Sequence, residues 1–152
     1  MFDPRQRFCW PFVSGRPFDS RRLQPPTVQR GKLTMYTIAK QFAFSASHII
    51  SGLPPEHPCG RLHGHNYVVE VILQLAELDS VGFVRDYREL SALKEFIDTT
   101  LDHNHLNAVL GHNRTTAEVI CKWLYDWCKA RWPEVIAVRV QETPKTWAEY
   151  RP

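Results

Sequence analysis

The stretch CGRLHGHNYVVEVILQL, residues 59–75, carries the clearest strand pattern of the chain. From about His65 to Leu75 an apolar side chain stands at every second position, which is the period of a strand with one buried face. Residues 36–48 alternate in the same way, and a loop with three prolines, residues 51–58, separates the two segments. The pattern therefore predicts two strands that pair as a hairpin. Their buried faces are expected to carry Ile38, Phe42, Phe44, Ala46 and His48 on the first strand, and Tyr67, Val69, Val71, Leu73 and Leu75 on the second.

Beyond the hairpin, the spacing of apolar residues becomes helical. Asp86 and Glu89 form a capping-box pattern, and we expect the helix that opens there to bury Leu90, Leu93, Ile97 and Leu101. A second helix is expected from near Thr116 to Pro133, with an apolar face made by Val119, Ile120, Trp123, Leu124, Trp127 and Cys128. A third strand is expected to bury Ile136, Val138 and Val140, and a short fourth one covers residues 147–150. Runs of strands and runs of helices, rather than strict alternation, predict an α+β fold with an antiparallel sheet.

The basic residues gather at the start of the chain. The 152 residues are enough for one domain, and the net charge is +3. Residues 1–34 hold seven basic and two acidic residues, so residues 35–152 carry a slight negative charge, which gives no electrostatic reason to expect a nucleic-acid partner. We expect residues 1–34 to be a disordered extension or upstream sequence translated in error, with Met35 as the true start, and residues 35–152 to be the domain.

Cysteine usage and hydropathy indicate a cytoplasmic protein. Cys121 and Cys128 lie seven residues apart on an expected helix, about 10.5 Å along its axis, which is too far for a disulfide. Free thiols without a secretory signal are typical of a reducing compartment. No apolar run approaches the roughly 20 residues of a membrane span, so no membrane partner is expected.

Three histidines form the clearest chemical pattern. His63 and His65 stand two apart at the head of a strand, so both imidazoles project from one face. If the hairpin pairs as expected, His48 comes level with them, and three histidines with an open position are typical of catalytic zinc. Cys59 could be a fourth ligand, which would make the site structural, or a nucleophile or base beside an open metal.

Three other groups are weaker candidates. The pair Asp102-His103 suits proton transfer, although a histidine at a helix C-terminus that interacts with the dipole is the simpler interpretation. Glu142 ends a strand, and a carboxylate there matches a heterocycle that presents an amino group and a ring N–H; an exposed strand-end glutamate is the alternative. Thr115 and Thr116 are interpreted as a helix N-cap, and such an N-terminus can also donate to a ligand.

Taken together, these residues occur in a recognisable order: F-x-x-S-H at 44–48, C-x3-H-G-H-N-Y at 59–67, L-D-H-x-x-L-N at 101–107, T-A-E at 116–118 and E-T-P at 142–144. The set resembles the 6-pyruvoyl-tetrahydropterin synthase family of tunnelling-fold enzymes, over residues 36 to about 151. The spacing C-x3-H-G-H is similar to the bacterial branch, the 6-carboxytetrahydropterin synthases of queuosine biosynthesis. Thr115 is a departure, because many bacterial members carry proline there, and we expect it to affect only the start of the helix.

The resemblance implies a fold, a reaction and roles for the residues. It implies a four-stranded sheet with two helices on one face, in the order ββααββ, and a homo-oligomer built as a dimer of trimers. It implies that 7,8-dihydroneopterin triphosphate is converted to 6-carboxy-5,6,7,8-tetrahydropterin, acetaldehyde and triphosphate. A pyruvoyl-forming synthase, which only eliminates triphosphate, and a structural-zinc pterin-binding module are the alternatives. The implied site comprises zinc on His48, His63 and His65, the catalytic residues Cys59, Asp102 and His103, and the pterin-binding residues Glu142, Thr116 and Glu118.

Overall fold

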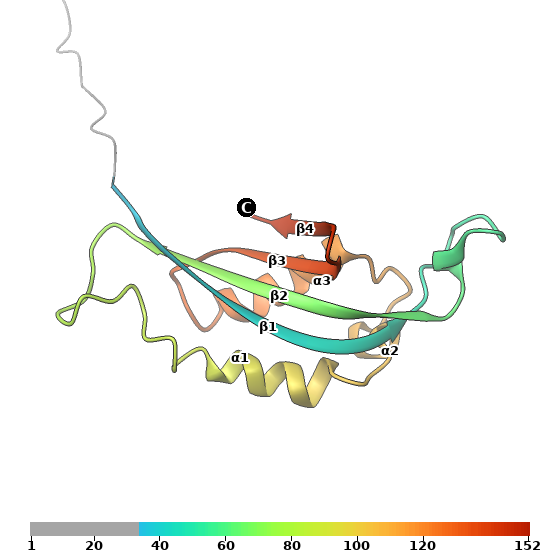
Figure 1. Cartoon of the computed structure of the whole chain (residues 1–152), viewed down its shortest axis with the longest axis horizontal. Coiled ribbons are helices and arrows are strands. Elements are labelled where there is room, and N and C mark those ends of the chain that lie inside the picture. Colours follow the sequence, from blue (N-terminus) through green and yellow to red (C-terminus); the bar gives the residue numbers. More distant parts are fainter. Residues whose placement is uncertain (1–33) are drawn as a thin grey trace, which may run out of the picture. The chain divides into compact units, whose positions relative to one another are not determined.

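The structure, a computed structural model, describes residues 34–152 (Figure 1). Apart from Thr34, the expected N-terminal extension lies outside the described residues. Four strands form one sheet in the order β1-β2-β3-β4, and every neighbouring pair is antiparallel. The strands are β1 (Tyr36–His48), β2 (His63–Leu75), β3 (Val135–Thr143) and β4 (Thr146–Tyr150). The predicted antiparallel sheet and α+β class are therefore confirmed.

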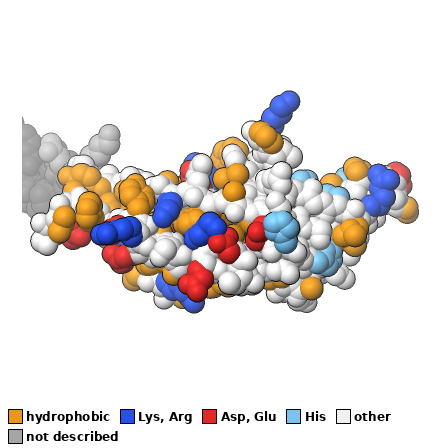
Figure 2. All heavy atoms as spheres, turned by 60° about the horizontal axis from the view of Figure 1, so that its bottom comes forward, with side chains coloured by type: hydrophobic (Ala, Val, Ile, Leu, Met, Phe, Trp, Pro, Cys, Tyr) orange, Lys and Arg blue, Asp and Glu red, His pale blue; other side chains and the backbone are white. Residues whose placement is uncertain are grey.

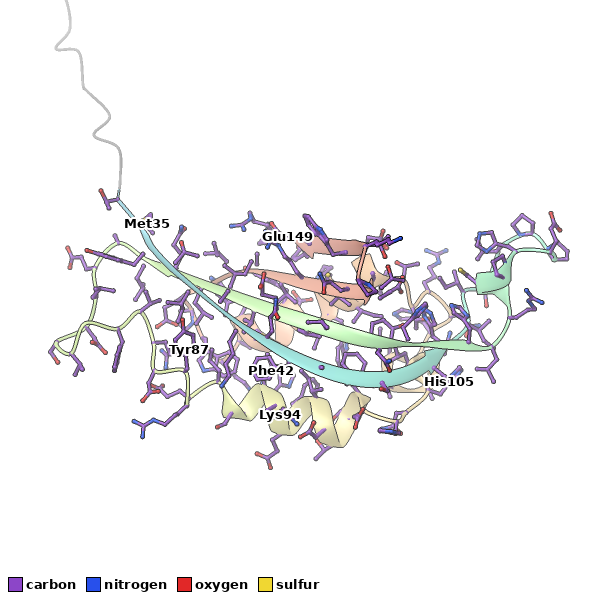
Figure 3. All side chains as sticks on the ribbon, viewed as in Figure 1. Met35, Phe42, Tyr87, Lys94, His105 and Glu149 are labelled. Atoms are coloured by element: carbon purple, nitrogen blue, oxygen red, sulfur yellow. The ribbon has the colours of Figure 1, made fainter. Side chains whose placement is uncertain are left out.

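The β1–β2 hairpin is the longest pairing in the molecule. Its register runs without interruption from Tyr36 opposite Leu75 to His48 opposite His63. Side chains of alternate residues on both strands form the buried face, as the period-two pattern predicts. Figure 3 shows one of them, Phe42, between β1 and α1 (Ser91–Phe96).

The helices pack on this buried face and complete one hydrophobic core. The principal helices are α1, which continues as the π-helical turn η3 (Ile97–Leu101), and α3 (Ala117–Lys129). The stripe predicted for the first helix is fully buried: Leu90, Leu93, Ile97 and Leu101. The described cysteines, Cys59, Cys121 and Cys128, are all free, as expected. None of the helices within residues 34–152 is long and apolar enough to cross a membrane.

One helix boundary differs from the prediction, and one helix is additional. The first helix begins at Ser91 and not directly after Asp86, because the Asp86 carboxylate accepts hydrogen bonds from the backbone N–H and guanidinium of Arg88 and closes a local turn. A short helix, α2 (Leu106–Leu110), which the apolar spacing did not indicate, lies between the two predicted helices. Gly111, in the left-handed conformation, ends α2.

The face predicted for the third strand is also wrong at one position. Val135 is fully buried in the core, whereas Ile136 is only half-buried. The pairing explains the change, because Leu73 lies opposite Val135 while its neighbour Ile72 lies opposite Ala137. Ile136 is the extra residue of a β-bulge, which shifts the alternation of side chains by one position.

Gly64 is required by the close pairing of β1 and β2. A Cβ at this position would lie 2.8 Å from the carbonyl oxygen of Ala46 in the opposite strand. We expect Gly64→Ala to lower the free energy of unfolding by about 1–3 kcal/mol, because the backbone must move to relieve the overlap. Urea denaturation measures the change.

Gly60→Ala is the matched control, because a Cβ there would have its nearest neighbours at 3.9 Å. Its unfolding midpoint should stay close to that of the wild type. Equal stability of the Gly64 and Gly60 variants would contradict the close contact between the two strands.

Candidate functional site

The hairpin register brings three imidazoles together at one end of the sheet. His48 lies directly opposite His63, and Ala46 lies opposite His65, so all three histidines project from the buried face. The ring centroids are 4.4 Å apart for His48 and His63, 5.3 Å for His48 and His65, and 5.1 Å for His63 and His65. One nitrogen from each ring lies within 4.8 Å of the others, so the group could hold a metal ion. In Figure 2, histidine side chains gather toward this end of the molecule.

Backbone carbonyls orient two of the three rings. His48 Nδ1 donates to the carbonyl oxygen of Thr115 at 2.8 Å, and His63 Nδ1 donates to that of Arg61, also at 2.8 Å. The Nε2 atoms of both rings are buried, and neither has a hydrogen-bond partner among residues 34–152. A carbonyl on one ring nitrogen fixes the tautomer in which the other nitrogen offers its lone pair, as in histidine-bound metal sites. The donor set therefore fits a metal ion.

Burial also favours the ligand form of His48. The ring is fully buried, and this desolvation lowers the pKa of the imidazole. His63 and His65, when charged, lower it further, because like charges repel. A neutral imidazole is the form that binds a cation.

Cys59 lies in the loop that joins β1 to β2, close to the start of β2 and outside the group of three histidines. It sits in the 3-10 turn η2 (Pro58–Gly60), where its thiol is free and the residue is half-buried. Its N–H donates to His57 Nδ1 at 3.1 Å, and its carbonyl accepts from Ile50 at 3.0 Å. His57 thus caps the turn that carries the thiol.

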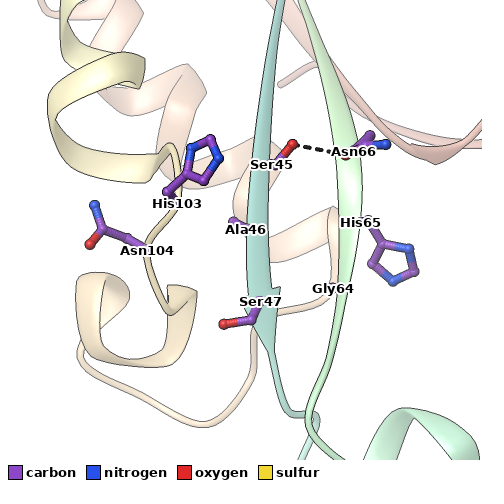
Figure 4. Close-up of a pocket in the computed structure, with 8 residues that line it drawn as sticks. All are labelled: Ser45, Ala46, Ser47, Gly64, His65, Asn66, His103 and Asn104. Atoms are coloured by element: carbon purple, nitrogen blue, oxygen red, sulfur yellow. Dashed lines mark hydrogen bonds between the residues drawn. The ribbon is translucent and has the colours of Figure 1, made fainter.

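Asp102 and His103 are held against the edge of β1 that does not pair with β2. The Asp102 carboxylate accepts from the backbone N–H of Ser45 at 2.8 Å and contacts His103 Nδ1 at 2.8 Å. His103 has a φ of 57°, and its side chain is 82% exposed. Figure 4 shows its ring beside β1, while the ring of His65 lies beyond β2. Both residues line one pocket, and in this view their rings lie on opposite sides of the β1–β2 pair.

One pocket is lined by the three residues expected to bind the pterin, which are Glu142, Thr116 and Glu118. Ile50 and Trp147 are among its other walls. Oε1 of Glu142 is buried and has no partner among the described residues, and this burial raises the pKa of the carboxyl group. The Thr116 side chain hydrogen-bonds Glu118 and lowers the pKa of that carboxyl group. The pocket therefore presents one paired and one unpaired carboxylate.

Sequence reasoning missed two residues that support the histidines. Thr115 was expected to affect only the start of the helix, but it is fully buried and its carbonyl holds His48. Asn107 clamps the residue after His48, because its amide both accepts from the N–H of Ile49 at 2.9 Å and donates to its carbonyl at 2.8 Å. The only signal for Asn107 was its place in the L-D-H-x-x-L-N motif.

Comparisons with known proteins all point to one family. A model of the family described as 6-pyruvoyl tetrahydropterin synthase matches residues 37–152. A relative from Bacillus subtilis, named 6-carboxy-5,6,7,8-tetrahydropterin synthase, is 32% identical over 131 residues, which cover 77% of this chain and 86% of the relative. A relative of the same name from Haemophilus influenzae is 26% identical over 77% of this chain and 99% of its own. The solved 6-pyruvoyl tetrahydropterin synthase of Caenorhabditis elegans is 25% identical, covers 79% of this chain and 97% of its own, and gives a TM-score of 0.69.

The unpaired Glu142 carboxylate should destabilise the ligand-free protein at neutral pH. Because its pKa is raised in the folded state, folding takes up a proton, and stability falls as pH rises from the unfolded value near 4.5 through the folded pKa. Glu142→Gln should therefore raise the melting temperature at pH 7 and flatten this part of the pH profile. Thermal unfolding between pH 4 and 8 measures both effects, and a melting temperature at pH 7 below that of the wild type would contradict the prediction.

Proposed function

The chain belongs to the 6-pyruvoyl tetrahydropterin synthase family, and from this membership we propose that it is a zinc-dependent lyase acting on 7,8-dihydroneopterin triphosphate. The proposed products are 6-carboxy-5,6,7,8-tetrahydropterin, acetaldehyde and triphosphate, in a cytoplasmic step of queuosine biosynthesis. The names of the Bacillus and Haemophilus relatives favour this branch of the family.

The observation that carries the proposal is the pairing of a metal-binding group with a carboxylate pocket. The unpartnered Nε2 atoms of His48 and His63 and the unpartnered Oε1 of Glu142 are buried at the same end of the sheet. Glu142 lies within the electrostatic field of His65 and His63, which lower its pKa against the larger effect of burial. A substrate with an oxygen-bearing side chain and an amino-pyrimidine ring has complementary groups for both sites.

The chain's own residues have distinct proposed roles in this reaction. Glu142 accepts hydrogen bonds from the amino group and ring N–H of the pterin, with Thr116 and Glu118 beside it. Cys59 and His103, the latter held by Asp102, move protons at the substrate side chain from opposite sides. Zinc on the three histidines, when bound, supplies the Lewis acidity that polarises side-chain oxygens and acidifies the neighbouring C–H. Elimination of triphosphate, addition of one water and cleavage of a side-chain carbon–carbon bond then give 6-carboxytetrahydropterin and acetaldehyde.

An oligomer is part of the proposal. β1 and β4 are the edges of the sheet, and joining these edges between copies would close a barrel and pair the backbone groups that residues 102–105 leave free on β1. His103 is exposed, and in Figure 4 its ring lies on the opposite side of the β1–β2 pair from the ring of His65, so a neighbouring subunit is proposed to complete each site. A dimer of trimers is the assembly we propose.

Two alternatives make different products or none. A pyruvoyl-forming synthase would use the same ligands but retain the carbons lost as acetaldehyde. A structural-zinc module would need a fourth protein ligand, and among residues 34–152 the metal-binding group contains three histidines without Cys59. Purified protein should be incubated with dihydroneopterin triphosphate and its products identified by mass. Acetaldehyde with 6-carboxytetrahydropterin is the expected result; a pyruvoyl product without acetaldehyde would overturn the branch, and no turnover by zinc-loaded protein would overturn the activity.

A pair of variants separates metal binding from chemistry. Cys59→Ala should keep zinc and lower turnover by about 10²–10⁴-fold, the usual contribution of a positioned acid or base. His63→Ala should lose zinc and turnover together, because two imidazoles are too few to hold the ion. Zinc content by atomic absorption and turnover on the same preparations provide the measurement.

His57→Ala is the control for this pair, since His57 is a histidine of the same loop that lies outside the metal-binding group. It should retain zinc. Loss of zinc from the Cys59 variant would instead assign the thiol as a fourth ligand and support the structural-zinc alternative.

A further inference from the structure

Buried polar atoms without partners concentrate at one end of the core. Six such side-chain atoms occur among residues 34–152, and four of them belong to His48, His63, Tyr67 and Glu142. Nearly all buried donors and acceptors in proteins are hydrogen-bonded, so a cluster of exceptions indicates a place where other groups supply the partners. The proposed metal site and pterin pocket account for the histidines and Glu142. The hydroxyl of Tyr67 is left without a role.

Tyr67 and Glu142 occupy neighbouring positions on paired strands. Val69 lies opposite Val140 and Val68 lies opposite Gln141, and the next residue on each strand is Tyr67 on β2 and Glu142 on β3. Tyr67 is fully buried beside Val69, and the Oε1 atom of Glu142 is buried as well, at the point where β3 shifts its register with β4. Burial is the main cause of the raised pKa of Tyr67, and the charge of the nearby Glu142 carboxylate raises it further.

The ring of Tyr67 is held rigidly and does not line the pocket. It is fully buried, stacks on Phe44 at 4.9 Å, and is edge-on to His48 at 6.0 Å and to His65 at 5.5 Å. Tyr67 is absent from the residues that line the Glu142 pocket. Its hydroxyl can therefore affect a ligand only through a side chain that does line the pocket, and Glu142 is the adjacent one with an unpartnered acceptor.

We propose that Tyr67 is a positioning residue for Glu142, and that its hydroxyl donates a hydrogen bond to the Glu142 carboxylate when a pterin is bound. This inference rests on the proposed function, because it assumes that Glu142 receives the pterin. A carboxylate has about four acceptor positions, so one bond from Tyr67 leaves room for the ligand's amino group and ring N–H. The bond fixes the carboxylate plane in the orientation that accepts both ligand donors at once.

Tyr67→Phe tests the proposal, because it removes one oxygen and keeps the ring. In the ligand-free protein the hydroxyl has no partner, so the melting temperature of the variant should equal or exceed that of the wild type. Its affinity for pterin (2-amino-4-oxopteridine), measured by fluorescence titration, should fall about tenfold, the effect of one lost hydrogen bond to a charged group. Zinc content should not change. A merely structural tyrosine would instead lower the melting temperature and leave the affinity unchanged.

A double-mutant cycle tests whether Tyr67 acts through Glu142. If it does, Tyr67→Phe should cost little affinity in a Glu142→Gln background, whereas independent roles would give additive losses. Phe44→Leu is the matched control, because it disturbs the packing of the same ring without removing a polar group. It should lower the melting temperature and leave the pterin affinity within about twofold of the wild type.

Failure of this inference can be distinguished from failure of the proposed function. A zinc-loaded wild type that does not bind pterin would overturn the proposed function and this inference with it. Wild-type binding that Tyr67→Phe leaves unchanged, or additive losses in the cycle, would overturn the inference alone. A Tyr67→Phe protein that does not fold would also overturn it, because the hydroxyl would then stabilise the ligand-free protein.

Discussion

The antiparallel register of β1 and β2 determines both the hydrophobic core and the metal-binding group. It sets His48 opposite His63 and, by the same alternation, places Phe42 and Phe44 in the core. A shift by one residue would move every side chain of β1 to the opposite face of the sheet. The same pairing therefore forms the core and assembles the metal-binding group. A change of register would disrupt both.

The parts of the fold that could be predicted are those governed by local periodicity. The alternation of apolar residues predicted β1 and the apolar face of β2. The helical spacing of Leu93 and Ile97 predicted the buried stripe of the first helix. The errors arose where a local contact or a pairing partner decides the outcome. The Asp86 carboxylate accepts a hydrogen bond from the backbone N–H of Arg88, so the helix begins later than predicted. The bulge opposite Ile72 and Leu73 displaces Ile136 from the buried face.

The candidate site could be predicted to a similar degree. The histidines were found because two of them stand at strand spacing and the third ends the paired strand. The contribution of Thr115 could not be read in the same way, because it reaches His48 across 67 positions of sequence. Asn107 is 58 positions from the residue that it clamps. Such support depends on which segments pack together, and no local pattern encodes it.

The two ends of the β1–β2 hairpin are far apart, which has a practical consequence. Tyr36 pairs with Leu75 at one end, and His48 pairs with His63 at the other. At about 3.3 Å per residue, the separation along the strand is roughly 40 Å. An affinity tag or fusion partner joined just before Tyr36 would thus be attached at the end of the hairpin remote from the histidines. A polyhistidine tag placed there would start well away from the imidazoles whose metal content is to be measured.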